Sequence, residues 1–488
     1  MSLSSVAAQV RHAEHRGRDV EVVDATHDSR QVVPGALFCA IPGTRVDGHE
    51  HAPAAVRAGA SALLVERWLD LDVPQVKVPS VRAATGPAAA AVHGHPSHDL
   101  TVVGITGTNG KTTTAYLLEG AFAAAGQGTG VIGTIETRIH GTRQPGQRTT
   151  PEGTDLQRML RTMHTRGVDA VAMEVSSHGL DLRRVDGTRF AVAVYTNLSQ
   201  DHLDWHVSME AYLTAKARLF ARERAERGVV YLDGPWAQVL LDRVRIPVTT
   251  VGRDASADVR IVEETTGVGG SHAVLRLPDR SLPIATTLPG RFNLANAATA
   301  VVAALAAGVP AEAASAGVAA CSGAPGRLER VPSDAPFTVF VDYAHTPDAV
   351  TQVIDSVRDA AEPGARVIVV LGAGGERDRQ KRGPMGAAAA QADLAVLTSD
   401  NPRTEDPKVI VEAVAAGAQA AVGAGARAEV IVELDRGAAI GLALAAARDG
   451  DVVVIAGKGH EAVQEIDGRV IPFDDRLVAA RLLAGGAA

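Results

Sequence analysis

The stretch SMEAYLTAKARLF, residues 208–220, places a lysine where a helix would bury apolar side chains. At the i, i+3, i+4, i+7 spacing of one helical face stand Met209, Tyr212, Leu213, Lys216, Leu219 and Phe220. Lys216 lies in the middle of that face. Its side chain either extends along its four-carbon stem to reach water, or remains in a dry pocket as a neutral amine that can react.

The stretch GITGTNGKTTT, residues 104–114, lies between an apolar strand and a helical pattern. Glycines there let backbone amides converge on phosphate oxygens, Lys111 can reach the outer phosphates, and Thr112 offers a hydroxyl to Mg²⁺. The literal Walker pattern is not met, because Ile105 stands five positions before Gly110, so a plain glycine-rich turn is the alternative. Gly-Lys-Thr-Thr at a strand-to-helix junction favours a nucleotide phosphate site.

Glu174 ends the apolar strand DAVAMEV. Its carboxylate should therefore project from the carboxyl edge of the sheet, where such sheets bind ligands. An isolated acid in that position suits Mg²⁺, although a helix cap or a surface ion pair is the alternative. Together with the phosphate loop, the position favours a metal ligand.

The loop NLSQDHLDWH, residues 197–206, follows the next strand and precedes the helix of Lys216. It carries two acids and two histidines, namely Asp201, His202, Asp204 and His206. Their spacing matches no zinc site. Because the loop lies at the same sheet edge as Glu174, it could supply a second metal ligand.

These loops need parallel sheets to position them, and short apolar runs alternate with helical patterns almost throughout the 488 residues. We predict an α/β protein of three domains. Residues 1–97 form a smaller α/β domain, residues 98–325 a central P-loop-type ATPase sheet, and residues 326–488 a Rossmann-like, doubly wound sheet. The segment HGHPSHDL, residues 93–100, is predicted to be a linker.

The composition excludes several classes of protein. A net charge of −8 and an aromatic content of 3% argue against a nucleic-acid surface. Two cysteines, Cys39 and Cys321, indicate a reducing compartment, and the first residues lack the apolar core of a signal peptide. The charge-free stretch from Phe292 to Pro310 suits a buried helix better than a membrane span. We expect a cytoplasmic monomer without membrane insertion.

The chain resembles the Mur ligase family along its whole length, and most closely its MurE type, which extends UDP-N-acetylmuramoyl-L-alanyl-D-glutamate. The motifs that carry the resemblance are GTNGKTT, MEVSSHGL, DHLDWH, AYLTAKARLF, PGRFNLANAATA, PGRLERV, DYAHTPDA, DNPR and GKGHE. The resemblance implies an ATP-dependent amide ligase. A substrate carboxylate would attack the γ-phosphate of ATP, and a neutral amine would then displace phosphate from the acyl phosphate.

The resemblance also implies a role for each matching residue. Around ATP it places Gly107, Thr108, Asn109, Gly110, Lys111, Thr112, Thr113, Asn296, Arg327, Asp342 and His345. Lys111, Glu174, His202 and Lys216 would be catalytic, and Thr112, Glu174, His202 and Lys216 would hold Mg²⁺. Lys216 would act as a carbamate formed with CO₂. Because some ATP residues come from the third domain, domain closure is expected to precede chemistry.

The nucleotide-sugar peptide would be bound by Ser29, Thr44, Arg45, Val46, Thr149, Thr150, Ser176 and Arg184. Considered alone, Ser29 is a turn residue. One position departs from the family, since Leu182 stands where some members carry a polar residue. That departure weakens this single correspondence without affecting the neighbouring Arg184.

The added amino acid is expected at the DNPR motif, which resembles that of members adding meso-diaminopimelate. The positions concerned are Arg377, Asp400, Asn401, Pro402, Arg403, Gly457 and Glu461. Arginine grips a carboxylate with two hydrogen bonds, and diaminopimelate carries a second carboxylate and ammonium at its far end. Lysine has only an ammonium there, which Arg403 would repel. A plain turn is the alternative for the motif.

Three other functions remain open from the sequence. The chain could add lysine to the same precursor or glutamate to a folate, although the first 100 or so residues before the phosphate loop disfavour the folate ligases. It could also be a switch protein that hydrolyses ATP without forming an amide. Dependence on the dipeptide and on a particular amine separates these functions.

Overall fold

The computed structural model describes residues 1–43, 46–146, 148–376 and 378–486. The chain forms two compact units, one of Met1–Arg260 with Thr299–Gly317 and one of Ile261–Ala298 with Val318–Ala488. None of the helices in these described ranges is both long and apolar enough to cross a membrane.

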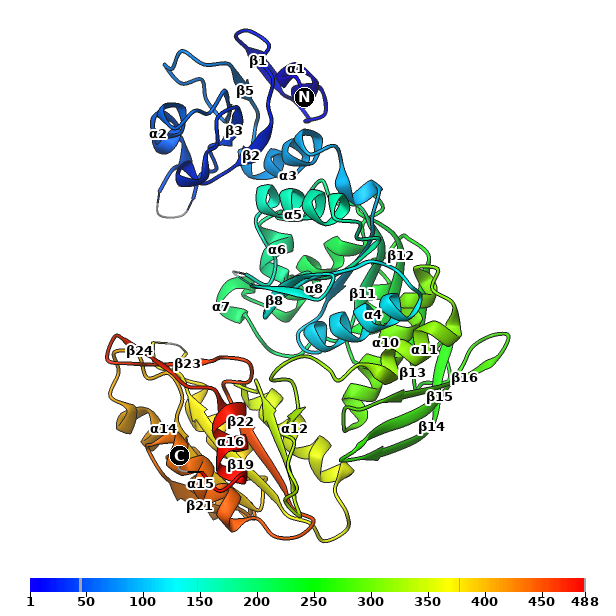
Figure 1. Ribbon diagram of the computed structural model, residues 1–488, viewed down its shortest axis with the longest axis vertical. Coiled ribbons are helices and arrows are strands. Elements are labelled where there is room, and N and C mark those ends of the chain that lie inside the picture. The colour runs from blue at the N-terminus through cyan, green and yellow to red at the C-terminus, as the bar shows by residue number, and fades with distance from the viewer. Residues whose placement is uncertain (44–45, 147, 377, 487–488) are drawn as a thin grey trace. The chain divides into compact units, whose positions relative to one another are not determined.

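The first unit begins with a five-stranded sheet covered by helices on both faces (Figure 1). Its elements are α1 (Leu3–Ala8), β1 (Glu14–Arg16), β2 (Asp24–Thr26), η1 (Ser29–Gln31), β3 (Ala36–Cys39), η2 (Gly48–His51), α2 (Ala52–Arg57), β4 (Ala62–Val65), β5 (Gln75–Lys77), α3 (Val81–Val92) and η3 (Pro96–His98). The strand order is β1-β5-β4-β3-β2, and only β1 is antiparallel to its neighbour. Helices α1 and α3 pack on one face, and α2 covers the other.

The second sheet of this unit carries the phosphate loop. Its elements are β6 (Thr101–Thr106), α4 (Lys111–Ala124), β7 (Thr129–Ile132), β8 (Glu136–Ile139), β9 (Thr142–Pro145), α5 (Gly153–Thr165), β10 (Ala170–Glu174), α6 (Ser177–Asp181), β11 (Phe190–Tyr195), α7 (Leu203–His206), α8 (Met209–Ala217), η4 (Arg218–Phe220), β12 (Ala225–Tyr231), α9 (Ala237–Leu241) and β13 (Val248–Gly252). The order β13-β12-β11-β6-β10-β7 is parallel throughout. Strand β6 lies between β10 and β11, at the point where the strand order reverses and where ligands of such sheets bind.

The expected parallel α/β architecture is confirmed, and its strands are buried because helices cover both faces. Every residue of β10 is buried, and so is every residue of β6 except the first. The helical face of residues 208–220 is also confirmed. Tyr212, Leu213 and Phe220 are buried, and Thr214 and Arg218 are exposed.

Antiparallel strands extend the sheets beyond what the sequence patterns predicted. Strands β8 and β9 pair antiparallel beside β7, and β14 (Val259–Gly267) begins in parallel beside β13. In the second unit, β15 (Gly270–Arg276) pairs antiparallel with β16 (Ser281–Thr286). Buried and more exposed residues alternate along β15 and β16, as in strands that have one face exposed to solvent.

The second unit continues with α10 (Arg291–Ala306) and α11 (Ala311–Ala320), each of which lies partly in the first unit, and with a six-stranded sheet. The sheet and its helices are β17 (Glu329–Arg330), β18 (Thr338–Asp342), α12 (Pro347–Ala360), β19 (Val367–Ala373), α13 (Arg382–Ala389), β20 (Leu394–Ser399), α14 (Pro407–Gly423), β21 (Glu429–Val432), α15 (Arg436–Ala446), β22 (Val452–Ala456), β23 (Val463–Ile466), β24 (Arg469–Pro472) and α16 (Asp475–Leu483).

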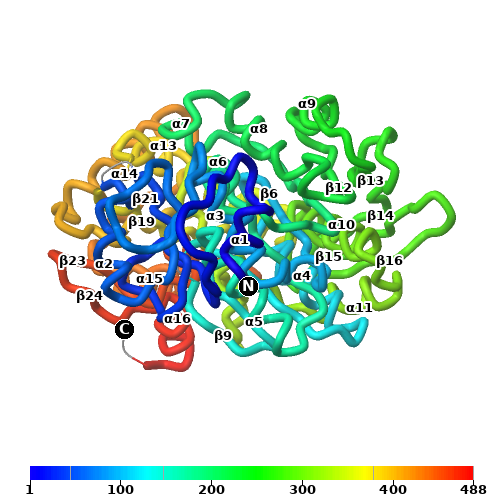
Figure 2. Tube along the Cα trace, turned by 90° about the horizontal axis from the view of Figure 1, so that it is seen from above, coloured from blue at the N-terminus to red at the C-terminus, as the bar shows by residue number. Residues whose placement is uncertain are grey.

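In this sheet the order β18-β22-β19-β20-β21 is parallel, and β17 pairs antiparallel with β18. Helices α12, α13 and α14 pack on one face, and α15 and α16 pack on the other. Figure 2 shows α13 next to α14, where glycines allow the two backbones to touch. Strands β23 and β24 form a separate hairpin that no sequence pattern predicted.

A substitution at Gly86 can test how α3 packs against the rest of the first unit. A Cβ atom at this position would lie 2.0 Å from the carbonyl oxygen of Asp186. We predict that Gly86→Ala destabilises the first unit by about 1–3 kcal/mol, because the backbones must separate. Differential scanning calorimetry measures the change. Gly234→Ala is the control, since a Cβ there meets nothing within 4 Å, and equal melting temperatures of the two variants would contradict the prediction.

Candidate active site

The phosphate loop connects β6 to α4, and two of its glycines adopt backbone angles that other residues avoid. Gly107 has φ 154° and Gly110 has φ 82°. A Cβ atom on Gly107 would lie 1.9 Å from the hydroxyl of Thr196. The loop therefore needs glycine for close approach as well as for conformation. Lys111 donates to the carbonyl oxygens of Gly107 at 2.9 Å and Thr108 at 2.7 Å, which holds its ammonium over the loop.

Two residues that directly follow β11, Thr196 and Asn197, bind the other side of this loop. Sequence reasoning missed both of them. The Thr196 hydroxyl donates to the Asn109 carbonyl oxygen at 2.6 Å. The Asn197 side chain accepts from the Asn109 amide at 2.9 Å and donates to the Asn109 carbonyl oxygen at 3.1 Å. Their position directly after a strand beside β6 was the available signal. The phosphate loop is thus fixed by the neighbouring strand.

Glu174 ends β10, as predicted, and its carboxylate reaches the first turn of α4. The Thr112 hydroxyl donates to its Oε2 at 2.9 Å, and Thr113 is buried next to it in the same turn. Thr134 was not predicted, yet its amide and hydroxyl donate to Glu174 at 2.8 and 3.1 Å. The structure therefore brings Thr112 and Glu174 together and adds Thr134 as the residue that orients the carboxylate.

These oxygens fit the Mg²⁺ that the resemblance implies, because Mg²⁺ prefers carboxylate, hydroxyl and phosphate oxygens. Glu174 is 1% exposed, and the groups of Thr112 and Thr134 that donate to it carry no charge. Within the described residues, no three His, Cys, Asp or Glu side chains form a metal-holding group by themselves. Thr112 and Glu174 would hold the cation, which when bound offsets the negative charge of the phosphates.

His202 directly precedes α7 with a left-handed backbone, φ 52°, and lies 3.4 Å from Asp201. Its ring meets the edge of the His178 ring, with centroids 4.7 Å apart. Partial burial, with the nearby ammonium of Lys111, lowers the pKa of His202. Burial and two other histidines lower the pKa of His178 to about 4. Both imidazoles are neutral at pH 7, which is the form that binds metals.

Lys216 is 1% exposed, so its side chain does not reach water. Its Nζ donates to the Gly107 carbonyl oxygen at 2.7 Å and lies 4.3 Å from the centroid of the Tyr212 ring. Burial, together with the ammonium of Lys111, holds the pKa of Lys216 well below its usual range. The sequence left two alternatives for this lysine, and the structure supports the neutral amine beside the phosphate loop.

Three of the residues expected around the nucleotide-sugar peptide lie at the same edge. The Thr149 hydroxyl lies 3.0 Å from that of Thr134. The Thr150 hydroxyl donates to the Glu174 carbonyl oxygen at 3.1 Å and accepts from the Ser176 amide at 2.9 Å. Ser176 also caps α6. Thr149, Thr150 and Ser176 therefore adjoin the Glu174 site.

Arg184 lies beside these hydroxyls in a cluster of charges that the sequence did not reveal. It pairs with Glu152 at 2.9 Å and donates to the Thr150 carbonyl oxygen at 3.2 Å. Arg82 and Arg148 pair with the same carboxylate at 2.6 and 2.9 Å. Burial opposes the charge of Glu152, but the arginines hold its pKa below the usual value. Because three arginines surround a single carboxylate, the cluster carries an excess of positive charge.

The first sheet carries the remaining residues of this set. Ser29 begins η1 and is half-buried, and Val46 is exposed. Thr44 and Arg45 lie outside the described residues, as does Arg377 of the amino-acid set. Ser29 and Val46 are far in sequence from Thr149, and their roles stay predictions.

The second unit carries four residues expected around ATP. Asp342 ends β18 and accepts from the amides of Leu328 at 2.8 Å and Ala344 at 2.7 Å, while burial raises its pKa. The Arg327 guanidinium lies 4.7 Å from the centroid of the Tyr343 ring.

The other two residues expected around ATP, Asn296 and His345, differ in their exposure to solvent. Asn296 is buried in α10, where it donates to Asn293 at 3.4 Å. The exposed His345 lies 2.8 Å from the Tyr343 carbonyl oxygen. Arg327, Asp342 and His345 thus share the carboxyl end of β18.

Two loops of the second unit meet where the added amino acid is expected. The Asn401 side chain donates to Glu461 at 2.8 Å. Gly457 has φ 112°, and a Cβ on it would lie 2.7 Å from Oδ2 of Asp400. The structure therefore brings together the Asp-Asn-Pro-Arg loop, including Pro402, and the Gly-Lys-Gly-His-Glu loop, at the carboxyl ends of β20 and β22.

The hairpin β23–β24, which no sequence pattern predicted, packs against these two loops. Arg403 has a left-handed backbone, φ 55°, donates to the Gly375 carbonyl oxygen at 2.5 Å and lies 3.5 Å from Glu465 of β23. The fully buried Lys458, which sequence reasoning passed over, donates to Asn401 at 3.2 Å and to the Val463 carbonyl oxygen at 2.5 Å. Arg403 and Glu461 thus lie on the two loops and carry opposite charges, and each is paired within the unit, Arg403 with Glu465 and Glu461 with Lys458, both at 3.5 Å.

Thr134 offers a test of the Glu174 site. We predict that Thr134→Val weakens Mg²⁺-dependent ADP binding about tenfold to a hundredfold, because one donor that orients the Glu174 carboxylate is lost. Isothermal titration calorimetry with and without Mg²⁺ measures the effect. Thr142→Val on the exposed strand β9 is the control, and unchanged Mg²⁺ dependence in both variants would refute the assignment.

Comparisons with known proteins cover nearly the whole chain. The Mur ligase middle domain matches residues 105–304, the glutamate ligase domain of Mur ligases matches residues 326–459, and the Mur ligase family catalytic domain matches residues 22–99.

Two curated relatives carry the same name, UDP-N-acetylmuramoyl-L-alanyl-D-glutamate--2,6-diaminopimelate ligase. The protein from Streptomyces avermitilis is 46% identical over 485 residues, which cover 98% of this chain and 95% of the relative. The protein from Geobacillus thermodenitrificans is 44% identical over 473 residues, which cover 95% of both chains.

Solved structures agree with this relationship. The structure of a UDP-N-acetylmuramoyl-L-alanyl-D-glutamate--2,6-diaminopimelate ligase matches with a TM-score of 0.71 and 33% identity, and the match covers 95% of both chains. Mycobacterium tuberculosis folylpolyglutamate synthase complexed with ADP matches with a TM-score of 0.61 at 22% identity, covering 76% of this chain and 90% of that one, so it shares the fold. The chain belongs to the Mur ligase family.

Proposed function

We propose that the chain is an ATP-dependent ligase that joins meso-diaminopimelate to the D-glutamate carboxylate of UDP-N-acetylmuramoyl-L-alanyl-D-glutamate. The observation that carries the proposal is the name of relatives 46% and 44% identical over nearly the whole chain. The opposed charges of Arg403 and Glu461 at the end of β20 and β22 support it, because both are needed to bind an amino-acid group. The reaction would belong to cytoplasmic synthesis of peptidoglycan precursors.

The first step activates the substrate carboxylate, which attacks the γ-phosphate of ATP to form an acyl phosphate and release ADP. The loop amides and the ammonium of Lys111 stabilise the negative charge on the phosphates. Arg184 and the hydroxyls of Thr150 and Ser176 would orient the peptide, so that its carboxylate lies in line for attack. Protein side chains position reactants and offset charge, and none of them forms a bond to substrate.

In the second step, the neutral amine of diaminopimelate attacks the acyl carbonyl, and phosphate leaves. Arg403 would bind the distal carboxylate, and Glu461 the distal ammonium. Lysine has no distal carboxylate, so Arg403 would face an ammonium instead. We therefore infer a preference for diaminopimelate over lysine.

We further propose that Lys216 acts as a carbamate. Its uncharged amine would attack CO₂, forming an N–C bond and releasing one proton, and the resulting anion would join Thr112, Glu174 and His202 around Mg²⁺. The burial of the amine and its lowered pKa support this step, because a protonated lysine has no lone pair to react.

The reaction can be tested by phosphate release. We predict that release from ATP requires the UDP-N-acetylmuramoyl dipeptide and meso-diaminopimelate together. Lysine in place of diaminopimelate should give a rate lower by an order of magnitude or more, since one good charged pair is lost. A malachite green assay with each reactant omitted measures this. Equal rates with lysine would refute the preference, and release without any amine would identify an ATP-hydrolysing switch protein.

The carbamate has its own test. We predict that Lys216→Ala lowers kcat by at least about a hundredfold, and that added acetate restores part of it by supplying a carboxylate in the same place. Lys216→Arg is the matched control, because it fills the space but can form no carbamate, and acetate should not rescue it. A ¹³C carbamate signal from labelled bicarbonate should appear only in the wild type. Full activity of Lys216→Ala would contradict the proposal.

A further inference from the structure

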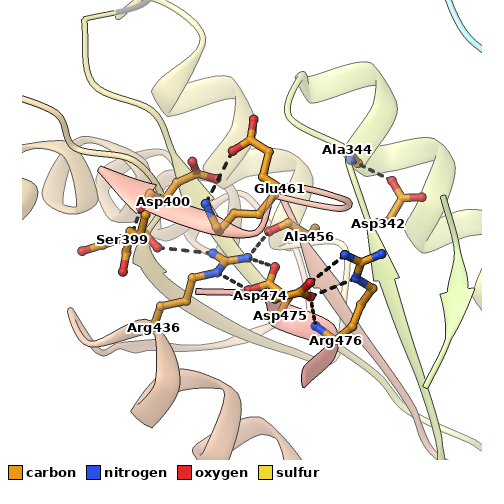
Figure 3. A network of polar contacts seen from close by, with 12 residues as sticks. Asp342, Ala344, Ser399, Asp400, Arg436, Ala456, Glu461, Asp474, Asp475 and Arg476 are labelled. Atoms are coloured by element: carbon orange, nitrogen blue, oxygen red, sulfur yellow. Dashed lines mark hydrogen bonds and ion pairs between the residues drawn. The ribbon is translucent and has the colours of Figure 1, made fainter. Parts of the chain in front are cut away.

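Arg436 and Asp475 form an ion pair that is completely buried in the second unit (Figure 3). Nε and Nη2 of Arg436 donate to the two carboxylate oxygens of Asp475, each at 2.7 Å. Both side chains are 0% exposed. Each residue begins a helix, α15 and α16 respectively, and both helices lie on the same face of the sheet.

Stability alone does not explain this pair. Removing two charges from water is unfavourable, and apolar replacements of such pairs are often as stable or more stable. Although burial opposes its charge, the facing carboxylates of Asp475, Asp400 and Glu461 raise the pKa of Arg436. The Arg436 guanidinium is therefore firmly charged, and the function of the pair must be sought in what this guanidinium contacts.

The remaining donors of Arg436 bind the ends of two strands. Nη2 donates to the carbonyl oxygen of Ala456 at 2.9 Å, and Nη1 to that of Ser399 at 3.3 Å. Ala456 ends β22 and Ser399 ends β20, and β19 lies between these strands in the sheet. One planar group thus ties two non-adjacent strands together at their carboxyl ends.

The loops that follow these two strand ends carry the amino-acid site. Asp400 follows Ser399, and Gly457 follows Ala456. The loops are already close, because a Cβ on Gly457 would lie 2.7 Å from Asp400. A change in the separation of the strand ends would therefore alter the distance between Arg403 and Glu461.

We propose that Arg436 and Asp475 are positioning residues for the added amino acid, because they set the spacing between the Asp400–Arg403 loop and the Gly457–Glu461 loop. The inference rests on the proposed binding of diaminopimelate at these loops. The pair does not touch the amino acid and acts through the residues that do. Lysine cannot replace Arg436, because a single ammonium cannot hold a carboxylate with two parallel bonds and also reach two strands.

The first test is Arg436→Lys, which keeps the charge. We expect the KM for meso-diaminopimelate to rise about tenfold or more, and the KM values for ATP and for the nucleotide-sugar dipeptide to change less than about twofold. Arg403→Ala is the reference for loss of a direct contact. If Arg436→Lys lowers kcat but leaves the KM for diaminopimelate unchanged, the proposal is wrong.

Arg366→Lys is the matched control. Arg366 pairs with Asp451 at 2.6 Å, and the two residues precede β19 and β22 at the opposite edge of the same sheet. We expect no change in the KM for diaminopimelate from this variant. A rise as large as that of Arg436→Lys would mean that any weakened ion pair disturbs the site, which would overturn the inference.

The double variant Arg436→Met with Asp475→Leu separates positioning from stability. We expect a melting temperature close to that of the wild type but a KM for diaminopimelate still raised about tenfold. A wild-type KM would refute the proposal, and so would failure to fold, since the pair would then serve stability. If the wild type releases no phosphate with diaminopimelate, the proposed function fails instead, and the two failures are distinguishable.

Discussion

The burial of the Lys216 side chain, which is 1% exposed, is the constraint on which the first unit depends. A charged lysine side chain has its lowest free energy when water solvates it. Here, however, the Nζ atom of Lys216 lies against the carbonyl group of Gly107 and the ring of Tyr212. Desolvation disfavours its charged form and holds its pKa well below the usual range. The same helix that buries it also supplies Tyr212 to the phosphate loop, so one apolar face serves both packing and chemistry.

The carboxyl ends of parallel strands organise both units in the same way. In the first unit, β6, β10 and β11 end together, which joins the phosphate loop, Glu174 and the Thr196–Asn197 corner. In the second, β18, β20 and β22 carry Asp342, Asp400 and Gly457 at their ends. Strands that are buried on both faces cannot carry reactive groups along their length, so such groups gather where the strands end.

Sequence reasoning succeeded where the signal was local. The strand before Gly107, the acid that ends β10, and the apolar face around Lys216 each follow from a spacing of a few residues, and the structure places them as predicted. It missed Thr134, Glu152, Lys458 and the hairpin β23–β24. None of these has a local pattern, because each has at least one partner far away in the chain, namely Glu174 for Thr134, Arg82 for Glu152 and Asn401 for Lys458, and the hairpin is a pair of short strands without helical neighbours.

The sequence by itself determined the parallel α/β class, the phosphate loop and the family, since these are encoded in periodicity and in short motifs. Tertiary structure alone decided that Lys216 is buried, because the face of a helix does not reveal whether water can reach it. It alone also revealed the pairing of Arg436 with Asp475, 39 residues apart in the chain. Desolvation and long-range ion pairing depend on what surrounds a group in space, which no local spacing records.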